Sequence, residues 1–489
     1  MNRPVIIAGA GPTGLMLAAE LRVFGVEAVV LERRPEPIPW SRALVLQRRS
    51  VEVFQQRGLH WFDDAPRWYS HNFGFVNLTR LNDREEYVPF RVAQRRVERL
   101  LEERCAETGV DLRYGHEVVA VAQDDDGVTV GVRGPDGAYE LRGAYLAGCD
   151  GGRSTVRKLA GVDFPGTAST CHGVTADVDS VGAEHPDGIK PQLTDKGLFA
   201  VTPLDDSDLF RATFIEFGVP LPDESVPVTV DELRDGIRRV TGLELELGEV
   251  HWLSRFGNAT RLAAEYRSGR VFLAGDAAHI HFPSGGQGLN TGIQDAVNLG
   301  WKLAADLHGW APAGLLDTYH AERHEVGRAV CMYAQSQVAL YHPLDRVGPL
   351  RSIVSELLSL EDVARYLLGL VTGVGLRYPL PGADAHPLIG QRVPSVELVT
   401  PSGSVSTNET LHDGRGVLLE LTDGAADLGD LSGWADRVAV VRGKPAPDLA
   451  ASVALVRPDG YIAYAHDGAA APEALHAALR TWFGEPDAA

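Results

Sequence analysis

The sequence predicts an α/β protein in which a Rossmann-like nucleotide-binding unit is interrupted by a β-sheet domain and followed by a third domain. A strand, a glycine-rich turn, a helix and a second strand follow one another over residues 4–34. Strands separated by Pro- and Asp-rich turns fill residues 166–255. Because a chain of 489 residues is too long for one ordinary core, two or three domains are expected.

The first unit predicts a dinucleotide site. Val5–Ala8 is a buried strand, the turn from Gly9 to Gly14 opens a helix, and Glu32 closes the second strand. Glycines allow a tight turn and a close approach of the backbone to pyrophosphate, which then lies at the helix N-terminus. The Glu32 carboxylate can accept hydrogen bonds from ribose hydroxyls and repels a 2′-phosphate, so NAD or FAD is favoured over NADP.

Two later segments carry similar signals. Asp150 and Gly151 end a strand, where they form either a second nucleotide-binding segment or a turn in which Asp150 caps the next helix. Asp276 also follows a buried strand and can bind a polyol hydroxyl. The turn Pro283–Asn290 presents N–H groups that suit an anionic ring, and a helix is expected from about Gly292 to Leu307.

The remaining pattern predicts the other elements. We expect a helix at Gln94–Glu107, helices over Leu315–Gly373, a linker at Tyr378–Ala383, then short strands, and a helix at Pro472–Phe483. The nucleotide-binding domain is expected in two parts, 1–165 and, with the helical segment, 259–380. The sheet domain is expected at 166–258 and the C-terminal domain at 386–489.

Charge and cysteine usage narrow the class of protein. The 66 acidic against 46 basic residues argue against a nucleic acid or an anionic membrane as partner. The four cysteines form no CxxC pair, no apolar run reaches membrane-spanning length, and the first strand leaves no room for a signal peptide. A cytoplasmic protein is therefore expected. His279 and His281 form an HxH pair without a third ligand at a suitable spacing, so no metal site is predicted.

Together these motifs resemble those of the class A flavoprotein monooxygenases, the para-hydroxybenzoate hydroxylase superfamily, and within it the aromatic polyketide hydroxylases of antibiotic pathways. The resemblance runs along the chain through Ser41–Ala43, Arg49–Phe54, Trp252–Thr260, Gly275–Ala304 and Tyr319–His324. It implies a Rossmann-like FAD-binding domain, and hydroxylation of a polycyclic aromatic substrate with NAD(P)H and O₂ through a flavin C4a-hydroperoxide. The protein would supply orientation, exclusion of water and stabilisation of the reduced flavin.

The resemblance also implies which residues contact FAD. The pyrophosphate and adenosine side would be bound by Gly9, Gly11, Pro12, Thr13, Gly14, Glu32, Arg33, Arg42 and Gln94. The ribitol and flavin side would be bound by Asp276, Pro283, Gly286, Gly288, Leu289 and Asn290. Asp150 and Gly151 match a motif linked to both FAD and NAD(P)H. The flavin environment that serves catalysis would be the backbone of Pro283, Gly285 and Gly286, without an obligatory acid or base.

Several alternatives stay open. The last hundred residues resemble a thioredoxin-like tail through Val456–Tyr461, but they contain no cysteine, so a structural role or a homodimer contact is favoured over thiol chemistry. Baeyer–Villiger oxidation, epoxidation or oxygenation of a rifamycin-type antibiotic would use the same motifs. A flavin-binding protein without turnover is the alternative of another class. The aromatic-rich loop Trp61–Phe90 either lines a pocket for a flat substrate or packs between domains.

Overall fold

The computed structural model describes residues 3–68, 71–78, 81, 84–182, 191–204, 207–223, 225–468 and 472–487. A six-stranded sheet has the order β19-β20-β11-β1-β2-β7. Its central strand β1 (Val5–Ala8) pairs in parallel with β2 (Ala28–Glu32) and β11 (Tyr145–Gly148). All residues of these strands are buried, as expected for parallel strands covered on both faces. The outer strands are β7 (Asp111–Tyr114), β20 (Val271–Leu273) and β19 (Arg267–Ser268).

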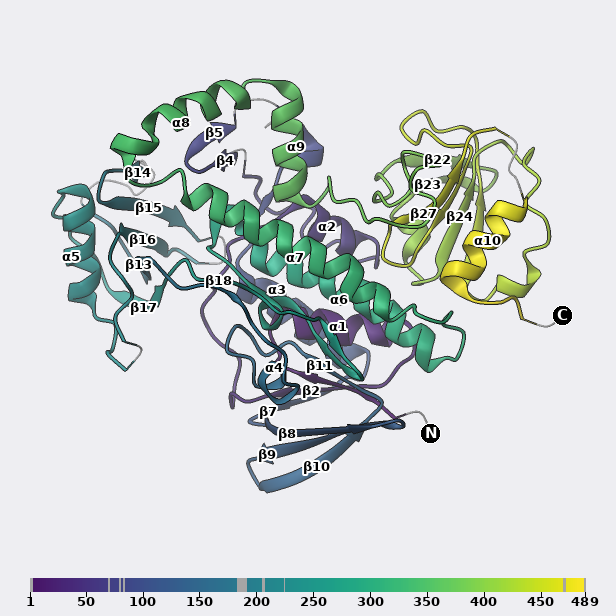
Figure 1. Cartoon of the computed structure of the whole chain (residues 1–489), viewed down its shortest axis with the longest axis horizontal. Coiled ribbons are helices and arrows are strands. Elements are labelled where there is room, and N and C mark those ends of the chain that lie inside the picture. Colours follow the sequence, from purple (N-terminus) through teal and green to yellow (C-terminus); the bar gives the residue numbers. More distant parts are fainter. Residues whose placement is uncertain are drawn as a thin grey trace.

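Two helices pack closely beside this sheet. α1 (Pro12–Val23) contacts α6 (Gln287–Leu307), and both lie in the middle of Figure 1. Glycines stand at their contact: a Cβ on Gly300 would lie 2.8 Å from the Cβ of Glu20. The predicted strand, turn, helix and strand of the first unit are confirmed. α6 begins earlier than expected, so the end of the predicted glycine-rich turn is helical.

The rest of the N-terminal region adds small elements around the sheet. α3 (Gln94–Glu107) has the predicted bounds. A three-stranded antiparallel meander is formed by β8 (Glu117–Asp124), β9 (Gly127–Gly134) and β10 (Gly137–Gly143). The shorter elements are β3 (Val45–Leu46), α2 (Arg48–Gln55), β4 (His71–Phe73), β5 (Val76–Leu78), η1 (Glu85–Tyr87), β6 (Phe90–Arg91) and α4 (Thr155–Leu159).

A second sheet has five strands in the order β14-β15-β16-β13-β17. They are β13 (Cys171–Val178), β14 (Gln192–Leu193), β15 (Gly197–Pro203), β16 (Phe210–Phe217) and β17 (Val250–Phe256). One face of this sheet is covered by α5 (Val230–Thr241), on the left of Figure 1. The expectation of strands and turns alone was wrong here. The Thr229 hydroxyl caps α5 by accepting from the N–H of Glu232, and left-handed Gly242 ends the helix.

Helices connect the second sheet with the C-terminal part of the chain. α7 (Asp317–Val338) packs on α6, and α8 (Leu344–Leu358) and α9 (Glu361–Thr372) follow at the top of Figure 1. This confirms the predicted helical segment. A three-stranded sheet beside α7 consists of β12 (Gly166–Thr167), β18 (Thr260–Leu262) and β21 (His279–Ile280).

The C-terminal sheet lies on the right of Figure 1 and has the order β25-β24-β26-β27. Its strands are β24 (Gly416–Glu420), β25 (Val438–Arg442), β26 (Val453–Val456) and β27 (Ile462–His466), which confirm the short strands expected after Tyr378–Ala383. β22 (Glu397–Thr400) and β23 (Gly403–Ser406) form a hairpin before it, and α10 (Pro472–Phe483) has its predicted bounds. β24 pairs with β25 in parallel, whereas β24 with β26 and β26 with β27 are antiparallel pairs.

The segment from Tyr378 is not a free linker, contrary to expectation. The Tyr378 side chain is 1% exposed, and its ring centroid lies 4.1 Å from that of Tyr461. Its hydroxyl accepts a hydrogen bond from the Arg323 guanidinium at 2.9 Å. Tyr378 and Leu380 therefore anchor the segment in the interior between α7 and the C-terminal sheet, whereas Pro379, Pro381 and Gly382 are exposed.

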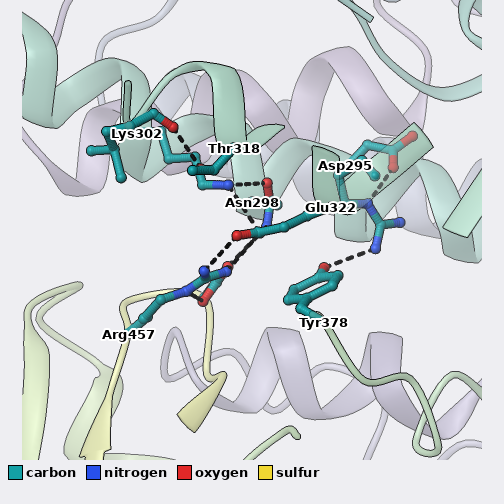
Figure 2. Close-up of polar contacts among 10 residues, drawn as sticks. Asp295, Asn298, Lys302, Thr318, Glu322, Tyr378 and Arg457 are labelled. Atoms are coloured by element: carbon teal, nitrogen blue, oxygen red, sulfur yellow. Dashed lines mark hydrogen bonds and ion pairs between the residues drawn. The ribbon is translucent and has the colours of Figure 1, made fainter. Parts of the chain in front are cut away.

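Buried charges also join the C-terminal sheet to α6 and α7 (Figure 2). Arg457, which follows β26, forms two hydrogen bonds with Glu322 of α7, at 2.7 and 2.8 Å. The Glu322 carboxylate also accepts a hydrogen bond from Lys302 Nζ of α6 at 2.9 Å. Burial would raise the pKa of Glu322, but the charges of Arg457 and Lys302 outweigh it and bring the pKa down to about 2. The carboxylate is therefore charged in the folded protein at neutral pH.

Stability is expected to fall in two stages on acidification. Burial lowers the pKa of His71 and of His324 below the ordinary value of 6.5, so the unfolded chain takes up protons first as the pH falls through 6.5. Burial would raise the pKa of Asp295, but Arg323 and His279 outweigh it and lower that pKa. With Glu322, this adds a second loss below about pH 4.5. Thermal melting from pH 8 to pH 3 measures both stages. A midpoint that rises on acidification from pH 6.5 would contradict the expected sign.

No helix among the described residues is both long and apolar enough to cross a membrane.

Candidate cofactor and substrate site

The glycine-rich turn after β1 is shaped by close backbone contacts. A Cβ on Gly14 would lie 2.0 Å from the Gly9 carbonyl oxygen, and one on Gly9 would lie 2.4 Å from the Cys149 carbonyl oxygen. A Cβ on Gly11, in contrast, would have no atom within 4 Å. Gly11 is the N-cap of α1 and offers no side-chain cap. The turn thus combines an open space with an uncapped helix N-terminus, which fits a pyrophosphate group.

Glu32 is held beside this turn at the end of β2. One carboxylate oxygen accepts from the N–H of Ala10 and the other from the N–H of Arg34, both at 3.0 Å. Each carboxylate oxygen can accept a second hydrogen bond, so the ribose role predicted for Glu32 is compatible with these contacts. The neighbouring Arg33 side chain is exposed.

Asp150 caps a helix, which is one of the two interpretations left open by the sequence. One oxygen of its carboxylate accepts from the N–H groups of Thr155 and Val156 at 2.7 and 3.1 Å, and the other from the Ser154 hydroxyl. A contact of Asp150 or Gly151 with a nucleotide stays a prediction. Gly151 faces open space, since a Cβ there would have no atom within 4 Å.

The segments around Asp150 and Asp276 are tied together by Arg157. Its buried guanidinium donates to the carbonyl oxygens of Gly152 and Ala277 at 3.0 and 2.8 Å. Asp276 lies in η3 (Gly275–Ala277), directly after β20, and its side chain is exposed. Both segments therefore end strands of the parallel sheet at the same edge as the glycine-rich turn, where α/β proteins bind nucleotides.

Asp295 of α6 fixes the segment that carries Asp276. The Asp295 carboxylate accepts from the Gly275 N–H at 3.0 Å, from His279 Nε2 at 2.8 Å and from Arg323 Nε at 2.6 Å. All of these side chains are fully buried. The imidazole of His279 is thus occupied by an acidic partner within the core.

The turn before α6 depends on two left-handed glycines. Gly285 and Gly286 have φ of +71° and +62°, which disfavours residues with a Cβ. Gly286 is the N-cap, so Gly288, Leu289 and Asn290 lie in the first turn of α6. This explains why the helix starts before the predicted position. The uncapped N–H groups of this first turn have the arrangement expected at an anion-binding helix N-terminus.

Asn290 holds this turn through its side chain. The Asn290 amide accepts from the Gln47 N–H at 2.8 Å and donates to the carbonyl oxygens of Val45 and Gly286 at 3.0 and 2.7 Å. Gln47 in turn donates to the Gly285 carbonyl oxygen at 2.7 Å. The structure therefore gives Asn290 a structural role, and sequence reasoning missed Gln47.

Arg42 lies in the segment 41–43, which contacts Gln94 at the start of α3 and Arg211 of the second sheet. Gln94 accepts from the Ala43 N–H at 3.2 Å and donates to Glu98 at 2.8 Å. The Arg42 side chain is exposed, while its carbonyl oxygen accepts from Arg211 of β16 at 2.9 Å. The Gln94 side chain is thus already engaged within the protein, whereas that of Arg42 is exposed.

An aromatic cluster lies between the second sheet, α7 and the turn before α6. Tyr341 stacks on Phe217 with ring centroids 5.8 Å apart, and Phe282 approaches the edge of Tyr341 at 6.0 Å. Phe256 lies beside Phe282 at 6.4 Å. The Tyr341 hydroxyl is 3.3 Å from that of Ser284, so the cluster adjoins Pro283. Sequence reasoning missed this cluster because its members come from distant elements.

The described aromatic residues of the loop Trp61–Phe90 pack against other parts of the protein, and a role in lining a substrate pocket stays a prediction. Trp61 and Phe62 pack against Phe54 of α2, with ring centroids 5.7 and 5.2 Å from it, so this contact lies within the N-terminal part of the chain. Phe73 instead meets the edge of Tyr333, at 5.2 Å. Residues 69–70, 79–80 and 82–83 of this loop lie outside the described residues.

Comparisons with known proteins agree over nearly the whole chain. A model of the FAD binding domain matches residues 2–334, and a model of the C-terminal region of aromatic-ring hydroxylases matches residues 386–486. A 12-dehydrotetracycline 5-monooxygenase/anhydrotetracycline 6-monooxygenase of Streptomyces rimosus is 44% identical, over 99% of this chain and 100% of the relative.

Two further relatives show the range of the family. A dialkyldecalin synthase of Streptomyces rugosporus is 42% identical, over 99% of both chains. The solved structure of CabE, an aromatic hydroxylase from angucycline biosynthesis, is 42% identical, with full coverage of both chains and a TM-score of 0.89. The chain therefore belongs to the FAD-dependent aromatic-ring hydroxylases, a family of monooxygenases.

Proposed function

We propose that this enzyme hydroxylates a polycyclic aromatic polyketide with NAD(P)H and O₂ in antibiotic biosynthesis. The observation that carries the proposal is the contact between the aromatic cluster and the turn before α6, through Phe282 and Ser284. This contact would set a flat substrate next to the flavin. The names of the relatives, which act on tetracycline intermediates or belong to angucycline biosynthesis, support the same substrate class.

The cofactor site proposed for FAD follows the sheet edge described above. The turn Gly9–Gly14 would hold the pyrophosphate, Glu32 the adenosine ribose, and Asp276 the ribityl chain. The nucleotide side would be lined by Arg33, Arg42, Gln94, Asp150 and Gly151. When bound, FAD supplies the redox chemistry that takes up hydride from NAD(P)H and activates O₂. We propose that the N–H groups at the start of α6, from Gly286 to Asn290, stabilise negative charge on the reduced flavin ring.

The aromatic cluster would orient the substrate and exclude water from it. A flat ring gains from stacking on side chains such as Phe217 and Phe256. The two hydroxyls of Tyr341 and Ser284 would hydrogen-bond an oxygen substituent. Burial raises the pKa of Tyr341, more than its bond with Ser284 lowers it, so the phenol keeps its proton at neutral pH and can donate.

We also propose the domain arrangement. Residues 1–165 and 259–380 would form the FAD-binding domain, residues 166–258 the substrate-binding sheet domain, and residues 386–489 a thioredoxin-like domain. The C-terminal strand order, with its one parallel and two antiparallel pairs, supports the last assignment. The connection from β24 to β25 has only the short turn η6 (Ser432–Trp434) where a thioredoxin has a helix. The described cysteines are all outside this domain, which favours a structural or dimer-contact role.

A second candidate function follows from one relative. The dialkyldecalin synthase is as similar to this chain as CabE is, and its name states a synthase rather than a monooxygenase. Ring formation without net oxidation is therefore the competing proposal. Baeyer–Villiger oxidation and epoxidation are competing oxygenations.

Substrate-dependent oxidation of NAD(P)H distinguishes these functions. The full-length, FAD-loaded protein is mixed with NADPH or NADH and with anthraquinones, angucyclinones, tetracyclic intermediates or rifamycins, and the product structures are determined. We expect one phenolic compound to accelerate NAD(P)H oxidation and to gain one hydroxyl group. A linear polyene, tested in the same way and cyclised without NAD(P)H consumption, would instead establish the synthase, and an inserted ring oxygen would establish Baeyer–Villiger oxidation.

A further inference from the structure

The second histidine of the HxH pair has no role in the site described so far. His279 pairs with Asp295 through Nε2. His281, at the start of the turn before α6, makes no ion pair in the described chain. His281 Nδ1 lies 2.8 Å from the Phe282 carbonyl oxygen. Because a carbonyl only accepts, Nδ1 carries the hydrogen, and Nε2 of the neutral ring is an acceptor.

This acceptor is buried and has no partner within the described residues. Burial lowers the pKa of His281, against a smaller opposing effect of the Phe282 carbonyl, so the ring is neutral at pH 7. The titratable groups that act on it are His279, which lowers the pKa further, and Asp276, which raises it. A buried acceptor without a donor is unfavourable, so the position calls for a donor from outside the chain.

The place of this nitrogen indicates which donor would reach it. A Cβ on Gly288 would lie 3.8 Å from His281 Nε2 and 3.8 Å from Asp276 Oδ1. The two acceptors therefore flank the same bare backbone position in the first turn of α6. A phosphate offers no donor to such a pair, whereas adjacent hydroxyls of a polyol chain offer one donor to each acceptor.

We propose that His281 binds the ribityl chain of FAD, with Nε2 accepting a hydrogen bond from one ribityl hydroxyl beside the Asp276 carboxylate. This inference rests on the cofactor site proposed above. It also explains a glycine at position 288, since a side chain there would enter the space between the two acceptors.

The first test measures FAD affinity of the full-length chain by quenching of FAD fluorescence. His281→Phe keeps a ring but removes the acceptor, and we expect the FAD dissociation constant to rise roughly 3- to 10-fold. His281→Gln can place an amide oxygen near the position of Nε2 and is expected to stay within about 2-fold of the unchanged protein. Tyr461→Phe removes another buried polar atom without a partner, in the C-terminal region, and serves as the matched control with unchanged affinity.

The second test identifies the hydroxyl. FAD analogues lacking the 2′-, 3′- or 4′-hydroxyl of the ribityl chain are titrated into the unchanged protein and into His281→Phe. We expect one analogue to lose affinity with the unchanged protein but to lose little more with His281→Phe, since both changes remove the same hydrogen bond. Melting curves of the variants without FAD confirm that they fold.

The outcomes separate this inference from the site on which it rests. The role of His281 alone would be overturned if His281→Phe and the unchanged protein bound FAD with equal affinity. It would also be overturned if every analogue lost as much affinity with His281→Phe as with the unchanged protein. If Asp276→Ala and Gly11→Ala also left FAD affinity unchanged, the proposed cofactor site itself would be wrong.

Discussion

Replacing Arg457 with methionine is expected to lower the free energy of unfolding by about 3–5 kcal/mol, because it leaves two buried carboxylates with a single cation, Lys302. Arg457 is fully buried and contacts Glu322 twice and Asp459 at 2.5 and 3.1 Å. Lys302 is the second cation of the group. Two positive and two negative side chains thus balance in the folded protein, and the substitution leaves one negative charge in excess.

The position of this group makes its loss more than local. Figure 2 shows Glu322 reaching from α7 to Arg457 of the C-terminal sheet, with Asn298 and Lys302 of α6 beside it. α6 is also the helix whose first turn forms part of the proposed flavin site. We therefore expect Arg457→Met to loosen the C-terminal sheet from α6 and α7 and to weaken FAD binding as a secondary effect.

Chemical denaturation of the FAD-free chain measures this effect, with Arg328→Met as the control. Arg328 pairs with Glu325 on the exposed face of α7, where solvent screens the two charges, so the loss of this pair should change the free energy of unfolding little. Adding Glu322→Gln to Arg457→Met removes the excess charge and should recover part of the loss, leaving Lys302 with Asp459. Equal unfolding free energies for Arg457→Met and Arg328→Met would show that the buried group does not hold the sheet in place.

Elements with local signals could be predicted from the sequence. The first strand, turn and helix combine apolar runs with glycines and a proline that fix their ends, and α3 and α10 show helical periodicity. α5 carried comparable signals in Thr229, Glu232 and Gly242, but the surrounding Pro- and Asp-rich turns hid them. The C-terminal contact could not be predicted, because Arg457 and Glu322 are separated by 135 residues and no periodicity links them.

The same distinction holds for the site. The glycines of the turn after β1 were predictable because their role depends on the backbone of the residues beside them. For Asp150 and Asn290 the structure adds side-chain contacts that cap α4 and hold the turn before α6, while their cofactor contacts stay predictions. Phe217 and Tyr341 approach each other only through the pairing of β16 with its sheet and the docking of α7. Such contacts depend on tertiary structure.

Replacement by alanine is expected to destabilise the fold at Gly14 and to weaken FAD binding at Gly11. At Gly14 an added methyl group would lie 2.0 Å from the Gly9 carbonyl oxygen and 3.2 Å from the Ile7 side chain, so the backbone must shift. We expect Gly14→Ala to lower the free energy of unfolding by about 1–3 kcal/mol. At Gly11 the methyl group meets no atom within 4 Å, and φ is −79°, which alanine adopts freely.

Gly11→Ala should therefore fold as well as the unchanged protein but bind FAD about 100-fold more weakly, a loss of about 2.7 kcal/mol, because its methyl group fills the space proposed for the pyrophosphate. Denaturation without FAD measures folding, and titration with FAD measures binding, so each variant is scored on both. Adenosine, which has no pyrophosphate, should bind Gly11→Ala and the unchanged protein equally. Normal FAD affinity of Gly11→Ala would place the pyrophosphate elsewhere. A loss of adenosine affinity as large as the loss of FAD affinity would point to a general disturbance of the nucleotide side. No described atom of the chain fills the space over Gly11, and for this reason we assign that space to the ligand.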